Sequence, residues 1–283
     1  MITDAVVPVA GLGTRLLPAT RSAPKEMLPV VDKPVVQYVL EELAGAGIER
    51  VLFVTGRRKR AIEDHFDHDP ELDDAPAPGE GLRLLYTRQP RPRGLGDALR
   101  HAEGFAGSSG VVVALGDAII EPPPAGAPGI VSRLAAAYLD TGASAALAVT
   151  EVAADQVQRY GIAIPRSLGD VIDVADVVEK PRPQGRHEPA RGRRSLRPRA
   201  GGVHRARPTE PDSSGEVQLT DALRHVIRDG GRVIAVQLAP GERHHDIGTV
   251  EGYCGAFLEH ALRHPTLGAA LRARAAALLD GAA

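Results

Sequence analysis

The residues best suited to chemistry lie close together near the start of the chain. A short apolar run at residues 5–9 leads into a loop that contains Gly11, Gly13 and Arg15, and Lys25 follows shortly after. Glycine lets backbone amides approach an anion closely, and Arg and Lys supply the positive charge that balances phosphate. The segment therefore predicts a phosphate-binding loop at the end of a strand, whereas the two glycines alone would indicate only a tight turn.

This loop is neither of two familiar glycine-rich phosphate motifs. A dinucleotide-binding fingerprint needs a third glycine where this chain has Leu16. A P-loop needs Gly-Lys followed by Ser or Thr, and that sequence does not follow here. The remaining interpretation is a phosphate site that combines glycines, two separated cations and the sequence Asp32-Lys33-Pro34.

The rest of the chain supplies the elements that must position the loop. Apolar runs rich in Val, Ile and Leu alternate with helical patterns, which is typical of an α/β protein with a mostly parallel sheet. The expected strands are residues 5–9, 51–55, 82–87, 111–115, 145–149, 160–164, 171–179 and 233–238. The expected helices are 35–46, one ending at 65, 94–105, 130–140, 217–228 and the stretch from 249. Residues 69–81, polar and rich in proline, are predicted to be a surface loop.

Composition excludes several classes of function. The chain has 283 residues and a formal net charge of −2, which provides no electrostatic attraction to nucleic acid or to a membrane surface. Aromatic residues make up 3% and Trp is absent, which argues against base-stacking surfaces. The single cysteine, Cys254, excludes an intramolecular disulfide, and no apolar run is long enough to cross a bilayer. We therefore expect a cytoplasmic protein that binds neither nucleic acid nor membrane.

A candidate metal ligand follows the most apolar strand. Asp117 comes soon after residues 111–115, at the carboxyl end where open α/β sheets bind ligands. A carboxylate there suits Mg²⁺, which prefers oxygen ligands and phosphates; for this residue alone, a strand-end Asp that caps a turn is an equally good interpretation. His244 and His245 invite a zinc interpretation, but neighbouring strand residues point to opposite faces, so we do not expect both to bind one ion.

Together these motifs resemble the signature of the sugar-1-phosphate nucleotidylyltransferases. The opening segment is similar to their G-x-G-T-R…P-K…L-P…D-K-P pattern, and residues 18–34 are most similar to the uridylyltransferases that use glucose 1-phosphate. Further matches are Gln89 with Gly94, Tyr160-Gly161, the Val-Glu-Lys-Pro sequence around Glu179 and Lys180, and the His-Asp-Ile-Gly sequence around Asp246. The resemblance implies one domain, residues 1–283, with a Rossmann-like, GT-A-like fold: a mixed, mostly parallel central sheet flanked by helices. Residues 249–283 are expected to form a C-terminal helical cover.

The resemblance also implies a role for each matched residue. The catalytic cations are Arg15 and Lys25. The nucleotide-binding residues are Ala10, Gly11, Gly13, Glu26, Gln89 and Gly94, of which Gln89 reads the pyrimidine through its amide. The residues that bind the sugar phosphate are Gly161, Glu179 and Lys180, and the cofactor is Mg²⁺ on Asp117 and Asp246.

These roles imply a phosphoryl-transfer reaction. An oxygen of glucose 1-phosphate attacks the α-phosphorus of UTP in line and pyrophosphate leaves, which needs positioning and charge neutralisation rather than a covalent nucleophile. The expected partners are UTP, glucose 1-phosphate and further copies of the chain, in a dimer or tetramer. Two alternatives stay open: a glucose-1-phosphate thymidylyltransferase, and a sugar-nucleotide-binding paralogue with impaired catalysis.

Three residues near the matched motifs have simple structural interpretations. Asp97 stands where the family often has His or Thr, and a helix N-cap is sufficient to explain it. Thr220 and Asp221 belong to a Gln-Leu-Thr-Asp sequence that the family also has, and we interpret both as capping groups in the first turn of a helix.

One segment departs from the family pattern. From Arg186 to Arg207 the chain has eight Arg and one acidic residue in 22 positions, where the family has a hydrophobic strand and a helix. With suitable GC-rich codons, a one-nucleotide shift restores both, so we hypothesise two compensating frameshifts within residues 184–207. The alternatives are a basic flexible loop and a polyanion-binding arm. As written, the sequence predicts a sheet that lacks one strand beside the sugar site.

Overall fold

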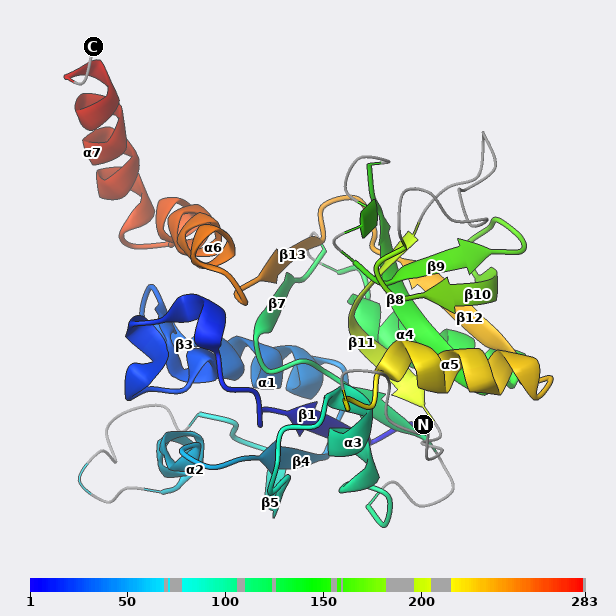
Figure 1. Ribbon diagram of the computed structural model, residues 1–283. Helices are drawn as coiled ribbons and strands as arrows, with labels where there is room; N and C mark the ends of the chain where they lie inside the picture. The colour runs from blue at the N-terminus through cyan, green and yellow to red at the C-terminus, as the bar shows by residue number, and fades with distance from the viewer. Residues whose placement is uncertain are drawn as a thin grey trace.

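A computed structural model describes residues 1–68, 71, 78–105, 110–123, 126–153, 157–158, 160–181, 196–204 and 215–281. Within these residues, nine strands form one sheet in the order β5-β4-β1-β6-β11-β8-β12-β10-β9 (Figure 1). Their bounds are β1 (Asp4–Pro8), β4 (Arg50–Thr55), β5 (Arg83–Arg88), β6 (Val111–Val113), β8 (Ala145–Glu151), β9 (Ile162–Pro165), β10 (Ile172–Val178), β11 (Leu196–His204) and β12 (Val233–Gln237).

The sheet combines parallel and antiparallel pairs. The strands β5, β4, β1 and β6 run parallel to one another, as do β8 and β12. The strand β11 is antiparallel to both of its neighbours, β6 and β8, and β10 is antiparallel to β12 and β9. The predicted α/β fold with a mixed sheet is confirmed.

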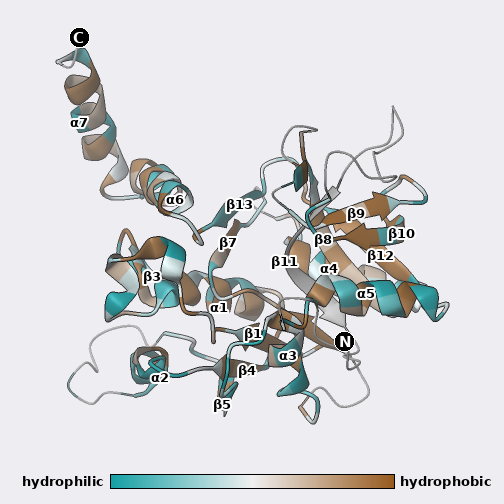
Figure 2. Ribbon diagram, viewed as in Figure 1, coloured by the Kyte–Doolittle hydropathy of each residue, from teal (hydrophilic) through white to brown (hydrophobic). Residues whose placement is uncertain are grey.

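Helices cover both faces of the sheet because alternate side chains of its strands are apolar on both sides. The helices are α1 (Val35–Gly45), α2 (Arg60–Phe66), α3 (Leu95–Arg100), α4 (Ile130–Thr141), α5 (Leu219–Arg228), α6 (Val250–Arg263) and α7 (Gly268–Asp280). In β1, Val7 packs in a core with Leu40 of α1, whereas the neighbouring Val6 packs with Leu99 of α3. Figure 2 shows the apolar residues concentrated along the strands. The helix expected over 94–105 ends at Arg100, and turns follow it.

A small hairpin lies beside the main sheet. The strand β7 (Ala118–Glu121) pairs antiparallel with β13 (Arg243–Asp246), so that Asp246 lies opposite Ala118 and His245 opposite Ile119. Because β7 begins directly after Asp117, the pairing brings Asp117 and Asp246 to the same end of the hairpin although they are far apart in the sequence.

The expectation that the sheet lacks a strand is wrong. The strand β11 occupies the place between β6 and β8, and its pairing with β8 shifts register between Pro198 and Gly202. Backbone hydrogen bonds to two flanking strands do not require apolar side chains, and a register shift accommodates a proline that lacks an N–H. Residues 182–195 and 205–214 lie outside the described residues, so the frameshift hypothesis stays a prediction.

The C-terminal stretch is helical, as expected, but only part of it covers the body of the molecule. The helix α6 contacts β13 and the short strand β2 (Pro29–Val30), whereas α7 packs on α6 and extends away from the sheet (Figure 1). Across the described part of the chain, no helix combines the length and apolar character that a membrane span needs.

Candidate active site

The glycine-rich loop lies where three parallel strands end together. The carboxyl ends of β1, β4 and β6 share one edge of the sheet, and glycine lets the segments that follow them approach closely. A Cβ atom on Gly56 would lie 3.1 Å from the carbonyl oxygen of Ala10, and one on Gly116 would lie 2.5 Å from Cγ1 of Val9. A larger residue at Gly116 would therefore push the loop away from the edge.

Lys25 passes beside this loop. Gly13 has a φ of +67°, a left-handed conformation that favours glycine, and its carbonyl oxygen accepts a 2.8 Å hydrogen bond from Oγ1 of Thr20. A Cβ on Gly11 would lie 3.7 Å from Nζ of Lys25. The glycine loop therefore contacts both Lys25 and the turn that precedes it.

The ammonium group of Lys25 forms an ion pair with Asp117. The two side chains are 16% and 19% exposed, so the pair is neither in bulk water nor fully enclosed. Burial lowers the pKa of Lys25, but the carboxylates of Asp117 and Glu26 outweigh it and hold that pKa above its usual value. Lys25 is therefore positively charged at neutral pH and available to a phosphate.

Glu26, the residue after Lys25, is buried with a partner that the sequence did not indicate. Its carboxylate is 2.6 Å from Nζ of Lys59, and the two side chains are 1% and 5% exposed. Burial raises the pKa of Glu26 and lowers that of Lys59, in each case against the attraction of the partner's charge. The structure shows Glu26 paired with Lys59, and its predicted role in nucleotide binding stays a prediction.

Arg15 and two carboxylates converge on Gly248, just after β13. A Cβ on Gly248 would lie 2.9 Å from Oδ1 of Asp246, 3.0 Å from Nη2 of Arg15 and 3.6 Å from Oδ2 of Asp117. The backbone N–H of Gly248 donates to Oδ1 of Asp246 at 3.0 Å. The structure therefore brings together four of the predicted residues: Arg15, Lys25, Asp117 and Asp246.

Gln89 is held by groups at the start of α3. Its side-chain nitrogen donates to the carbonyl oxygen of Gly94 at 3.2 Å and to Oδ2 of Asp97 at 2.7 Å. Both acceptors fix the direction of the amide, and its carbonyl oxygen is the group left to accept from a base. The interpretation of Asp97 as the N-cap of α3 is wrong, because that position is Gly94. Asp97 instead orients Gln89.

The predicted sugar-binding residues meet between β9, β10 and α5. A Cβ on Gly161 would lie 3.1 Å from Oε2 of Glu179, and Lys180 lies 3.5 Å from the other carboxylate oxygen. Oγ1 of Thr220 donates to Oε2 of Glu179 at 3.3 Å. The capping interpretation of Thr220 is therefore wrong, because the N-cap of α5 is Gln218 and the Thr220 side chain contacts Glu179.

Sequence reasoning missed Lys59 and interpreted Asp97 and Thr220 as capping residues. Lys59 lies in the run Gly-Arg-Arg-Lys-Arg, which is typical of a solvated surface, and nothing local distinguishes the one buried cation. The sequence positions of Asp97 and Thr220 indicated a role near the site, because both adjoin matched motifs. Their partners, Gln89 and Glu179, could not be predicted because they come from other parts of the chain.

Parallel strand ends, a glycine loop with two cations and a nearby carboxylate pair form a site in an α/β protein whose charges suit a phosphate. The chain belongs to the nucleotidyl transferase family, which it matches over residues 4–261. It is 38% identical over 280 residues to UTP–glucose-1-phosphate uridylyltransferase 1 of Streptococcus pyogenes serotype M1, a match that covers 93% of this chain and 90% of that protein.

Solved structures agree with this assignment. A UDP-glucose pyrophosphorylase from Acinetobacter baumannii is 30% identical, with a TM-score of 0.82 over 98% of this chain and 100% of that one. A UDP-glucose pyrophosphorylase complexed with UDP-glucose is 33% identical, with a TM-score of 0.81 over 93% of this chain and 100% of that one. A putative glucose-1-phosphate thymidylyltransferase from Bacillus anthracis, 19% identical with a TM-score of 0.71 over 91% of this chain and 94% of that one, shares the fold. The predicted family and nucleotidyltransferase fold are confirmed.

Proposed function

We propose that this chain transfers UMP from UTP to glucose 1-phosphate and releases pyrophosphate. The observation that carries the proposal is the convergence of Arg15, Lys25, Asp117 and Asp246 at the end of β1 and of the β7–β13 hairpin. The relatives named as UTP–glucose-1-phosphate uridylyltransferases and UDP-glucose pyrophosphorylases support the choice of substrates.

The two cations act on different parts of the triphosphate. Lys25, held by Asp117, stabilises the charge that develops at the α-phosphate while the sugar phosphate attacks it. Arg15, whose Nη2 would lie 3.0 Å from a Cβ on Gly248, stabilises the departing β- and γ-phosphates. The backbone of Ala10, Gly11 and Gly13 holds the nucleotide in line, which supplies much of the rate enhancement in reactions of this type.

The carboxylates of Asp117 and Asp246 fit Mg²⁺. Both present oxygen atoms near one point, as a hard cation requires, and both adjoin the proposed phosphate site. When bound, the ion would neutralise part of the charge on the phosphate oxygens. Lys25 shares Asp117 with this site, so it couples the position of the carboxylate to that of the α-phosphate.

The remaining predicted residues select the two substrates. Gln89, oriented by Asp97, accepts a hydrogen bond from the N3–H of uracil, and Gly94 allows the base to approach. Glu179 accepts hydrogen bonds from sugar hydroxyls, Gly161 leaves room for the ring, and Lys180 pairs with the sugar phosphate. Homo-oligomerisation and a cytoplasmic location stay predictions.

A coupled pyrophosphate-release assay tests the proposal. Glucose 1-phosphate is supplied with UTP or with dTTP, each with Mg²⁺ and with EDTA. We expect metal-dependent turnover that favours UTP. Faster turnover with dTTP would support a thymidylyltransferase instead, and binding of UDP-glucose without turnover would identify an impaired paralogue. The assay should use protein from a resequenced gene, which also tests the frameshift hypothesis.

A further inference from the structure

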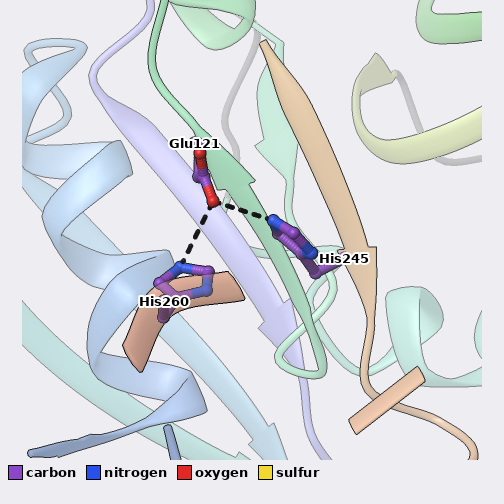
Figure 3. Close-up of side chains that lie close together, drawn as sticks. All are labelled: Glu121, His245 and His260. Atoms are coloured by element: carbon purple, nitrogen blue, oxygen red, sulfur yellow. Dashed lines mark hydrogen bonds and ion pairs between the residues drawn. The ribbon is translucent and has the colours of Figure 1, made fainter. Parts of the chain in front are cut away.

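Three side chains of types that commonly bind metals meet on the face of the β7–β13 hairpin that packs against α6. They are Glu121 of β7, His245 of β13 and His260 of α6, and their ligand atoms all lie within 4.8 Å of one another (Figure 3). Among the described residues this is the one group of three or more His, Cys, Asp or Glu side chains so arranged. None of the three has a role in the proposed reaction.

The separations between the ligand atoms are close to those around a tetrahedral metal ion. Nε2 of His245 lies 2.9 Å from Oε1 of Glu121, and Nε2 of His260 lies 3.8 Å from the same oxygen. Ligand atoms bound at about 2.1 Å in tetrahedral geometry are separated by roughly 3.4 Å. The two observed separations lie on either side of that value, so small side-chain movements suffice to admit an ion.

The environment fixes His260 as a ligand. Its Nδ1 is 2.9 Å from the carbonyl oxygen of Ala256, which can only accept, so Nδ1 donates there and Nε2 is the nitrogen that faces Glu121. The ring of Tyr38 packs against the imidazole with centroids 5.2 Å apart. A histidine held by a backbone carbonyl in this way is the usual arrangement around a bound metal.

The site is largely shielded from water. The side chains of His245, His260 and Glu121 are 8%, 12% and 23% exposed. Arg263 donates to both carboxylate oxygens of Glu121 and also to Glu259, so it can keep the second partner if an ion takes over Glu121. A bound cation and Arg263 therefore compete for Glu121.

We propose that Glu121, His245 and His260 bind a transition-metal ion of the zinc class, with a water molecule as fourth ligand. Two imidazoles and one carboxylate suit Zn²⁺, Co²⁺ or Ni²⁺ and disfavour Mg²⁺, which takes oxygen ligands. The site is distinct from the Asp117–Asp246 pair, because adjacent residues of β13 face opposite sides and His245 therefore points away from the face of Asp246.

The ion would join α6 to the hairpin that positions the acidic pair. Ligands come from β7, β13 and α6, and the first two elements adjoin Asp117 and Asp246. An ion that binds the folded state but not the unfolded state raises the stability of the protein by mass action. A metal-dependent rise in melting temperature is therefore expected whether or not the chain transfers UMP.

The test is a titration of EDTA-treated, untagged protein with Co²⁺, followed by its visible absorption, and with Zn²⁺, followed by melting temperature. We expect one ion per chain and at least about tenfold weaker binding in His260→Gln and in Glu121→Gln. His225→Gln, at an exposed histidine of α5, is the matched control and should bind as the parent does.

The proposal is overturned if the parent protein does not bind Co²⁺, or if H260Q and E121Q bind it as tightly as the parent. It is also overturned if Zn²⁺ raises the melting temperatures of H260Q and E121Q as much as that of the parent. Circular dichroism shows whether each variant is folded, and a variant that does not fold is replaced by His245→Gln. Because every readout is binding or melting, failure here does not depend on the proposed reaction.

Discussion

Lys25 is the residue on which the proposed chemistry depends most directly. It contacts Asp117, lies beside the glycine loop and is surrounded by carboxylates that keep it charged. Lysine near carboxylates is ordinary on a protein surface, but here both partners are partly withdrawn from water. The charge is therefore held in place before the substrate arrives, which makes it effective in stabilising a transition state.

Lys25→Ala should lower kcat by about a hundredfold or more, because a fixed positive charge at the α-phosphate is lost. Pyrophosphate release measures the effect, and circular dichroism verifies folding. Arg60→Ala is the control, since Arg60 is an exposed cation that pairs with Asp64 on the surface. A folded K25A protein with near-parental kcat would remove Lys25 from the mechanism.

Asp97→Ala should raise KM for UTP about tenfold with a smaller change in kcat, because a hydrogen bond to a charged group that orients Gln89 is lost. Steady-state kinetics at saturating glucose 1-phosphate separates the two constants. Asp97→Asn retains an acceptor and should restore part of the affinity. Glu103→Ala, exposed just beyond α3, should match the parent. Equal KM values in D97A and the parent would refute the orienting role.

At the scale of elements, the packing of α1 near the start of β13 brings two carboxylates close together. Glu42 of α1 lies near Glu242, just before β13, and Glu242 forms an ion pair with Arg133 of α4. Desolvation and the charge of Glu242 raise the pKa of Glu42 from 4.5 to about 8. Contacts between these elements therefore favour the protonated form of Glu42.

This shift predicts how stability depends on pH. Because the folded-state pKa of Glu42 is raised, the folded state binds more protons than the unfolded state between pH 4.5 and about 8. The free energy of unfolding should fall as pH rises through this range, by at most about 1.4 kcal/mol per pH unit. Glu42→Gln removes this dependence.

Urea unfolding of the parent and E42Q proteins at pH values across that range measures the difference between them, which should widen with pH. Glu41→Gln is the matched control, at the neighbouring exposed position of the same helix. If the curves of the parent and E42Q stay parallel, Glu42 does not titrate as its surroundings indicate.

At the scale of the whole molecule, α7 is the element that the fold leaves without a covering partner among the described residues. It packs on α6 and extends away from the sheet (Figure 1). Leu278 and Leu279 are 58% and 74% exposed, and an exposed apolar surface is often an interaction site. It is the natural candidate for the contact in a predicted homo-oligomer.

The double substitution Leu278→Asp, Leu279→Asp should lower the mass in solution from that of an oligomer to that of one chain, because charge is placed where apolar surface would be buried. Sedimentation velocity measures the mass. Leu168→Asp, at a similarly exposed leucine between β9 and β10, is the control and should leave the assembly unchanged. Unaltered mass in the double variant would exclude this surface of α7 as the contact.

Most of the fold could be predicted because its elements have strong local patterns. The apolar runs that became β1, β4, β6, β8 and β12 are bounded by turns, and the helices between them are amphipathic. The strand β11 could not be predicted, since its sequence contains Pro198 and two glycines and its formation depends on the open edges of β6 and β8. Propensity was overridden there by the neighbouring strands.

The sequence predicted the residues of the candidate site that belong to motifs, but not those that depend on packing. Arg15, Lys25, Asp117 and Asp246 were recognised from motifs, and the structure brings them together. Lys59 could not be predicted, because no local sequence pattern indicates its buried ion pair with Glu26. His244 and His245 are neighbours in β13 and face opposite sides, and His245 has partners in Glu121 and His260 that only packing reveals.

By itself, the sequence determined the family, the α/β class and the residues of the phosphate loop, because these follow from patterns within one short segment or one periodic element. Only the tertiary structure decided which distant residues meet: Asp117 with Asp246, Gln89 with Asp97, Glu179 with Thr220, and His245 with His260. The reason is physical. Local sequence fixes backbone conformation and burial pattern, whereas contacts across elements are set by strand order and close packing, which involve the whole chain at once.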